Sequence, residues 1–351
     1  MNENHSTTQP LSLKAKVVLA SFGCSLALGI SIAVLQFVSF GHKGTEFNSI
    51  QDLKRAMLTS PSTPISQDSA DPTEHNTSLR GIVEPHPDNR IIYTLRSDLD
   101  LTFIRARVRT NSCGMRSPER PIAKPAGVFR IALIGDSFAF GWGVEQDKIF
   151  AQVLEDSLNA RANNNLRFEV LNFGVPGYST FQEVALLEER GLDFQPDAVL
   201  VYFVQNDFGM PFFIRDIENN GGLLSSLKFI QLGKKLLSPG ALNSRIREVG
   251  LHPNQAMQRL IEITKQHGLK TFLAINPKKQ WKKYLKRLPA IKKHSGIHVI
   301  PLRDGLLEYI NQKKIPVKAL TLSYDPHPSE IRHTILGKLL TPYFLDAAGL
   351  L

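Results

Sequence analysis

The sequence predicts an α/β protein with a central parallel sheet, preceded by one N-terminal transmembrane helix. Two observations lead to this prediction. From residue 129 onward, short and largely apolar runs alternate with helical patterns, which is typical of a parallel sheet with helices on both faces. Near the N-terminus, residues 17–40 form one uncharged, mostly apolar run, and about 20 such residues cross a hydrocarbon core of about 30 Å.

We expect this run to be a retained anchor that follows a short tail, residues 1–16. A cleaved signal peptide has an apolar region of about 7–15 residues and a small-residue cleavage site, and the run shows neither feature. Lys14 and Lys16 precede the run and Lys43 follows it. This weak excess of positive charge favours an N-terminus in the cytoplasm and a body outside it, although charges farther along the chain offset the bias.

Residues 41–80 are expected to form a flexible linker. They are rich in Pro, Ser, Thr and Asp and lack apolar periodicity, so they cannot bury a core. Over the whole chain the net charge is +10, which favours anionic partners. Nucleic acid is not an expected partner, because the sequence has no zinc-finger, Walker or RNA-binding motif. The two cysteines, Cys24 and Cys113, exclude a disulfide framework and a cysteine-based zinc site.

Residues 81–128 are expected to be a β-rich segment. The alternation in Leu101–Thr110 predicts one strand, with Arg105, Arg107 and Arg109 on one face. We interpret these arginines as charge protection of an edge strand. The alternative is a docking stripe for an anionic partner.

The remainder, residues 129–351, is expected to form the catalytic domain. Its predicted strands are residues 129–135, 167–173, 197–203, 269–275 and 297–302. Its predicted helices are Asp147–Arg161, Ser179–Arg190, Pro253–His267 and Ser329–Leu345. Ser179 and Gln182 are spaced as a capping box. A less regular region, residues 208–250, carries Phe212 and Phe213.

Polar residues follow the strands at the points where a parallel sheet binds ligands, beyond the carboxyl ends of its strands. They are Asp136-Ser137, the run from Asn172 to Tyr178, Gln205-Asn206-Asp207 and, before the last helix, Asp325-Pro326-His327. A serine hydroxyl needs a base within hydrogen-bond reach to act as a nucleophile. His327 is the candidate base and Asp325 the candidate acid that orients it.

An oxyanion intermediate also needs preorganised hydrogen-bond donors. The backbone N–H groups of Ser137 and Gly177 and the side-chain amide of Asn206 are the candidates. Glycine suits this position because it allows the main chain to approach closely.

Four stretches resemble the sequence blocks of the SGNH, or GDSL, hydrolase superfamily, in the family's order: "GDSFAFGWGV", "NFGVPG", "QND" and "DPHP". The resemblance covers about residues 128–347. The segment "RTNSCGMRS" (Arg109–Ser117) also resembles bacterial membrane-anchored members. The resemblance implies a flavodoxin-like three-layer sandwich and hydrolysis or transfer of ester-linked acyl groups, often acetyl groups on carbohydrate, with no metal or organic cofactor.

The chain departs from the family pattern at three positions. The family commonly has Asp three residues before the histidine, where this chain has Tyr324, so Asp325 becomes the candidate acid. Gln205 and Arg332 stand where many members have glycine. His333 is a rival base, but its place inside the last predicted helix indicates a structural residue. Trp142 is interpreted as a packing residue rather than a platform for a sugar.

The basic run Lys278–Lys293 predicts an amphipathic surface helix with a solvated basic face. The alternative is contact with anionic glycan or phospholipid headgroups.

We therefore expect a serine esterase anchored in the bacterial inner membrane by residues 17–40, with a periplasmic catalytic domain. Its expected substrate is an O-acyl ester, above all an O-acetyl ester, of envelope or secreted polysaccharide. Three alternatives remain open: an O-acetyltransferase with the same residues, a lipase or lysophospholipase acting on a lipid ester, and a non-catalytic glycan-binding protein on an SGNH scaffold.

Overall fold

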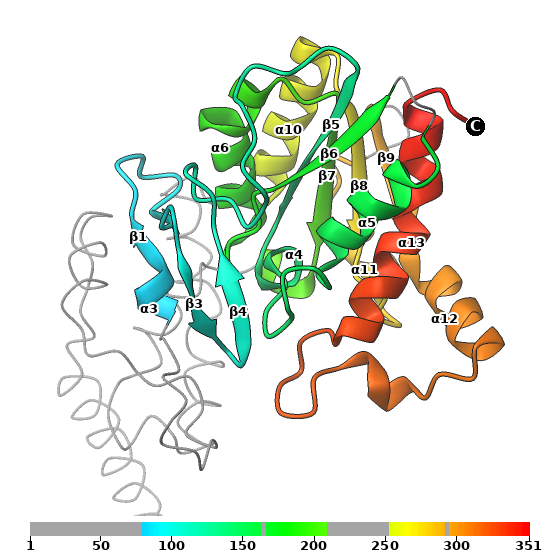
Figure 1. Cartoon of the computed structure of the whole chain (residues 1–351). Coiled ribbons are helices and arrows are strands. Elements are labelled where there is room, and N and C mark those ends of the chain that lie inside the picture. Colours follow the sequence, from blue (N-terminus) through cyan, green and yellow to red (C-terminus); the bar gives the residue numbers. More distant parts are fainter. Residues whose placement is uncertain (1–78, 163–165, 209–252, 292–294) are drawn as a thin grey trace, which may run out of the picture.

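The computed structural model describes residues 79–162, 166–208, 253–291 and 295–351, and its centre is a five-stranded parallel sheet (Figure 1). The strands are β5 (Val128–Gly135), β6 (Arg167–Asn172), β7 (Ala198–Phe203), β8 (Lys270–Ile275) and β9 (Ile297–Pro301). Their order is β6-β5-β7-β8-β9 and every neighbouring pair is parallel. This is the order of a flavodoxin-like sheet, so the predicted α/β class and central parallel sheet are confirmed.

Two apolar layers cover the sheet, because successive side chains of a strand point to opposite faces. Every residue of β7 is buried; Val199 and Val201 pack in one layer and Leu200 in the other. The first layer includes α6 (Thr180–Glu189) and α10 (Pro253–His267). The second includes α5 (Phe150–Asn159) and α13 (Glu330–Ala347). The two pairs of helices lie on opposite faces of the sheet in Figure 1.

The helices agree with the sequence in place but differ at several ends. The Ser179–Gln182 capping box is present. The α10 helix ends as predicted before Gly268, whose φ is +63°. In contrast, α5 begins at Phe150, because the residues before it form a turn in which the N–H of Lys148 donates to the carbonyl of Glu145. A further helix, α12 (Leu302–Gln312), was not predicted, although Leu302, Leu306 and Ile310 recur at helical spacing and are buried.

The long basic helix predicted over Lys278–Lys293 is wrong in extent. The structure has only α11 (Trp281–Lys286), six residues long, followed by turns in which Leu288 N–H donates to the carbonyl of Leu285. Pro289 lies directly after these turns, and proline lacks the N–H that a continuing helix needs.

The β-rich segment contains α3 (Leu79–Ile82) and two hairpins, β1–β2 (Val83–Pro85, Tyr93–Leu95) and β3–β4 (Asp100–Phe103, Ala106–Arg109). Neither hairpin joins the central sheet. The single strand predicted over Leu101–Thr110 is therefore wrong. Ile104 and Arg105 have φ values of +49° and +63°, which indicates a type I′ turn.

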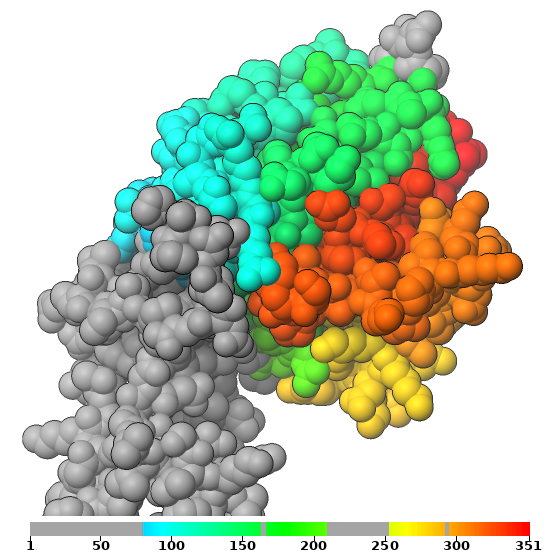
Figure 2. All heavy atoms as spheres, turned by 60° about the horizontal axis from the view of Figure 1, so that its bottom comes forward, coloured from blue at the N-terminus to red at the C-terminus, as the bar shows by residue number. Residues whose placement is uncertain are grey.

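This turn removes Arg105 from the predicted arginine face. Only Arg107 and Arg109 remain on one face, and Arg107 donates to both carboxylate oxygens of Asp100, at 2.6 and 2.8 Å. Arg105 lies over the ring of Tyr324, at 4.4 Å, and Tyr324 Oη donates to the carbonyl of Ile104 at 3.3 Å. The tip of the hairpin thus contacts the loop before α13, and in Figure 2 the cyan segment adjoins the green and orange-red parts of the surface.

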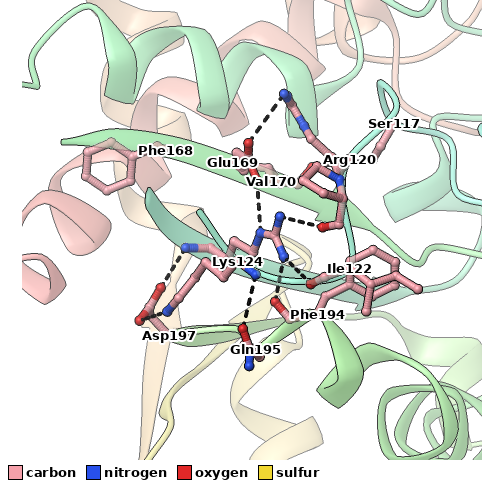
Figure 3. Close-up of polar contacts among 12 residues, drawn as sticks. Ser117, Arg120, Ile122, Lys124, Phe168, Glu169, Val170, Phe194, Gln195 and Asp197 are labelled. Carbon is pink, nitrogen blue, oxygen red and sulfur yellow. Dashed lines mark hydrogen bonds and ion pairs between the residues drawn. The ribbon is translucent and has the colours of Figure 1, made fainter. Parts of the chain in front are cut away.

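A buried arginine on β5 joins the β-rich segment to the amino-terminal end of the sheet. Arg130 is fully buried and its Nε donates to Glu169 Oε2 at 2.9 Å. Its other donors reach the carbonyls of Ile122 and Phe194, both at 2.8 Å, and that of Pro121 at 2.7 Å. Figure 3 shows Ile122, Glu169 and Phe194 around this network.

Several predicted features lie outside the described residues: the tail 1–16, the anchor 17–40, nearly all of the linker 41–80 and the Phe212/Phe213 region. Within the described ranges, no helix combines the length and the apolarity that a membrane crossing requires.

Candidate active site

The candidate nucleophile lies at the turn between β5 and a short helix, α4 (Ser137–Phe140). Asp136 caps this helix: its Oδ1 accepts from the N–H of Phe138 at 2.9 Å. The turn requires Gly135, because a Cβ there would lie 2.6 Å from that of Ala139. Ser137 is therefore held at the first position of a helix, at the carboxyl edge of the sheet.

Ser137, His327 and Asp325 form one connected set. The distance from Ser137 Oγ to His327 Nε2 is 2.8 Å, and His327 Nδ1 makes a short hydrogen bond with Asp325 Oδ1. The same oxygen accepts from the backbone N–H of His327 at 2.9 Å. Burial raises the pKa of Asp325, but the hydrogen bonds and charge of His327 outweigh it, so the pKa is lowered overall.

This charge state fixes the roles of the two ring nitrogens. An ionised carboxylate can only accept hydrogen bonds, so Nδ1 of His327 carries a proton and donates it to Asp325. Nε2 is then free to accept from the Ser137 hydroxyl. The side chains of His327 and Asp325 are 19% and 20% exposed, so the set is reachable from solvent.

The candidate oxyanion donors come from three places. Asn206, in the 3₁₀ turn η2 (Gln205–Phe208), donates from Nδ2 to Asp136 Oδ2 at 2.5 Å. This bond uses one of its two amide hydrogens and leaves the other available. Gly177 has a φ of +80°. Within the described ranges, no acceptor is assigned to the backbone N–H of Ser137 or Gly177.

The loop that carries Gly177 is packed directly against α4. A Cβ on Gly174 would come within 2.4 Å of the Phe140 nitrogen, so only glycine allows this approach. Asn172, which is fully buried, joins the two: its Nδ2 donates to the carbonyl of Ala139 and its Oδ1 accepts from Gly174, both at 3.0 Å. Asn172 was expected at the edge of the sheet, at the head of the glycine block, but no role was predicted for it.

Trp142 is buried, with 7% of its surface exposed. Its ring stacks on that of His327, with centroids 5.0 Å apart and planes 19° apart, and meets Phe103 edge-on at 5.0 Å. The sequence predicted packing for this residue but not its contact with the imidazole.

Arg116 supports the loop that carries Trp142, and it too was missed. Its guanidinium is buried in full and uses all five N–H donors on neighbouring chain segments. The acceptors are the carbonyls of Arg107, Phe140, Gly141 and Val144 and the side-chain oxygen of Gln146. Burial lowers its pKa to about 9, so it stays charged at neutral pH. The motif "RTNSCGMRS" contained this residue, but no periodicity marks it.

Comparisons with known proteins identify the family of the chain. The pattern of the GDSL-like lipase/acylhydrolase family matches residues 133–331. No curated protein sequence matches the chain.

Three solved structures illustrate what the fold is similar to. A two-domain esterase active on acetylated mannans is 14% identical, with a TM-score of 0.42, over 63% of this chain and 50% of its own, so this chain spans about half of it. The acetyl xylan esterase AlAXEase is 13% identical, with a TM-score of 0.40, over 61% and 99% of the two chains. The psychrotrophic esterase EstA from Pseudoalteromonas sp. is 13% identical, with a TM-score of 0.39, over 63% and 98%.

The family match covers more than half of the chain. It begins within β5 and includes the Ser137 turn, the glycine loop, Asn206 and the Asp325–His327 pair. The chain therefore belongs to the GDSL-like lipase/acylhydrolase family and is a hydrolase of that family.

Proposed function

We propose that the protein is a serine esterase that cleaves O-acyl esters, chiefly O-acetyl esters, of envelope or secreted polysaccharide through Ser137, His327 and Asp325. The observation that carries this proposal is the 2.8 Å contact between Ser137 Oγ and His327 Nε2, with Asp325 on the opposite ring nitrogen. A serine needs such a base to become a nucleophile at neutral pH.

In the first half of the reaction, Ser137 Oγ attacks the ester carbonyl and its proton passes to His327 Nε2. Asp325 stabilises the imidazolium that forms. His327 then protonates the leaving alcohol as the ester bond breaks, leaving the acyl group on Ser137. In the second half, His327 takes a proton from water, the resulting hydroxide attacks the acyl-enzyme, and the proton returns to Ser137.

The backbone N–H groups of Ser137 and Gly177 and the free amide hydrogen of Asn206 are proposed to bind the oxyanion. Asp136 supports this role, because its hydrogen bond to Asn206 fixes the orientation of the amide. One donor of this kind contributes about 10²–10³ in kcat.

The polysaccharide substrate and the location are further parts of the proposal. The anchor at residues 17–40, in the bacterial inner membrane with the catalytic domain in the periplasm, would keep the enzyme near envelope glycans. The net charge of +10 favours anionic polymers.

The first test is labelling with a fluorophosphonate probe. We expect the wild type and Ser112→Ala to react, since Ser112 is an exposed serine of the β-rich segment, and Ser137→Ala to remain unlabelled. On an acetyl ester, Ser137→Ala and His327→Ala should each lose about 10³-fold or more in kcat. Equal labelling of wild type and Ser137→Ala would overturn the assignment.

Substrate class is tested separately with an acyl-chain-length series and an acetylated glycan. Acetyl preference supports the proposal, whereas preference for long chains would favour a lipase. Transfer of acetyl to an added sugar acceptor faster than its release into solution would make the protein an O-acetyltransferase.

A further inference from the structure

We propose that Trp142 is a positioning residue for the reaction, because its ring holds the His327 imidazole in the plane that serves Ser137. This inference rests on the proposed function of Ser137 and His327. The backbone N–H of Trp142 donates to the carbonyl of Ser137 at 3.0 Å, a bond that other residues at this position could also make. The indole ring is stacked on His327, so the side chain acts through the histidine.

The need for such a contact follows from where His327 lies. It stands in the loop between the bridge residue Thr321 and α13, outside any long regular element. Its hydrogen bonds to Ser137 and Asp325 fix the two ring nitrogens but leave the ring free to tilt about the line between them. A flat ring stacked on one face removes this freedom, and Trp142 is stacked within 19° of parallel.

Phe138 also contacts the imidazole, but less directly. Its centroid lies 5.2 Å from that of His327 and the planes are 47° apart. Trp142 is thus the near-parallel partner. Its indole Nε1 is buried without a hydrogen-bond partner of normal geometry among the described residues, and its proximity is among the causes that lower the pKa of Asp325. The same side chain therefore faces both members of the acid–base pair.

Trp142 can position another ring only if it is itself fixed, and two contacts from the β-rich segment fix it. Phe103 of β3 packs edge-on against the indole at 5.0 Å. Arg116 binds the carbonyls on both sides of Trp142: that of Gly141 at 2.6 Å and that of Val144 at 2.6 Å. An aromatic pair of this kind contributes about 0.5–1.5 kcal/mol beyond its buried area.

The first experiment tests the stack in solution and needs no activity. The chain has two tryptophans, so Trp281→Phe leaves Trp142 as the only indole. A protonated imidazole in contact with an indole quenches its fluorescence. We expect the emission of Trp281→Phe to fall on acidification, and the fall to be absent from Trp281→Phe/His327→Gln.

Among the described residues, Asp325, Asp136 and His333 interact electrostatically with the imidazole, and Arg332 lies over the neighbouring Phe138 ring. Both proteins retain these four groups. An identical pH dependence of emission in the two proteins would overturn the proposal.

The second experiment measures the kinetic role on an acetyl ester. Trp142→Leu removes the flat face, and we expect kcat to fall about 10- to 100-fold with KM nearly unchanged, since a misplaced catalytic group costs this much. Trp142→Phe retains a flat ring and should recover most of the loss. Trp281→Phe is the matched control and should behave like the wild type.

The outcomes separate the two proposals. A rise in KM with unchanged kcat in Trp142→Leu would make Trp142 a substrate contact and overturn its positioning role. Full activity in Ser137→Ala would overturn the proposed function instead, whatever Trp142 does. If Trp142→Leu fails to fold, the fluorescence experiment can still overturn the proposal, because it tests the stack with Trp142 in place.

Discussion

Two histidines six positions apart have opposite surroundings. His327 is partly exposed and contacts Ser137. His333 is fully buried; its Nδ1 accepts from the N–H of Phe150 at 3.0 Å and its ring stacks on the Phe150 ring. Burial and then the positive charge of Arg332 lower the pKa of His333 to about 3. A group held neutral in this way suits a structural role, as its place in the last helix predicted.

His333 makes the free energy of unfolding depend on pH in the acid range. Between pH 6.5 and 3 the unfolded chain binds a proton at this imidazole and the folded chain does not, so stability falls as pH falls. The loss reaches about 2 kcal/mol at pH 5. His333→Asn should be less stable than wild type at pH 7, and the gap should narrow by about that amount at pH 5, measured by urea unfolding.

The control for this prediction is His267→Asn, a change at an exposed histidine at the end of α10. It should leave the pH dependence of unfolding as in the wild type. A gap between His333→Asn and wild type that stays constant from pH 7 to pH 5 would contradict the buried-histidine explanation.

At the scale of elements, the sequence predicted the central sheet well and the β-rich segment poorly. The strands of the sheet are continuous apolar runs because helices cover both faces. The β3–β4 turn was missed because Ile104 and Arg105 are not the Asn and Gly residues that type I′ turns favour. A turn of this kind is stabilised here by tertiary contacts, including the bond from Tyr324.

The candidate site shows the same division. Ser137, Asn206, Asp325 and His327 could be predicted because each follows a strand or precedes a helix in a family motif. The contact between Trp142 and His327 could not be predicted, because it joins loops 185 positions apart in the sequence, which no local pattern encodes.

One loop contact offers a test at this scale. Gly143 has a φ of +69°, and a Cβ there would lie 2.6 Å from Leu322 Cδ1 and 2.8 Å from Tyr324 Oη. Gly143→Ala should therefore push aside the ends of the Leu322 and Tyr324 side chains, which belong to the loop that carries Asp325. If this shift reaches Asp325, kcat should fall about tenfold or more. The strain of a left-handed alanine, about 1 kcal/mol, adds a loss of stability.

Gly268→Ala separates the two causes, because Gly268 has a similar φ of +63° and no atom within 4 Å of an added Cβ. It should lower the thermal midpoint but leave kcat unchanged. Equal kcat values for the two variants would show that the Gly143 contact does not reach the site.

At the scale of the whole molecule, the β-rich segment and the α/β part share one apolar core. Ile82, Tyr93 and Phe103 pack in the same layer as Val199 and Leu273 of the sheet. Two buried arginines connect the β-rich segment to the α/β part, one at each end of the central sheet. Arg116 binds the segment to the loop after the nucleophile, and Arg130 binds it to the opposite end of the sheet.

Replacing Arg130 should lower the free energy of unfolding and leave kcat unchanged. Arg130→Met removes the 2.9 Å partner of buried Glu169, which keeps only Arg120 at 3.6 Å, and it leaves three carbonyls without their donor. The free energy of unfolding should therefore fall by about 3 kcal/mol or more. At a temperature where the variant stays folded, its kcat should match the wild type. Arg161→Met, at an exposed arginine, should change neither quantity, and a large loss of kcat in folded Arg130→Met would contradict this division of roles.

The contacts of Arg116 have a practical consequence for the design of chimaeras between enzymes of this family. The family match begins at residue 133. It therefore includes His327 and Trp142 but leaves out Phe103 and Arg116, whose side chains hold Trp142 and its loop in place. A chimaera that exchanged only residues 133–331 would keep every motif and lose these contacts. The exchangeable unit must therefore include Arg116 and both hairpins of the β-rich segment, whose residues Ile82, Tyr93 and Phe103 pack in the same core as the sheet.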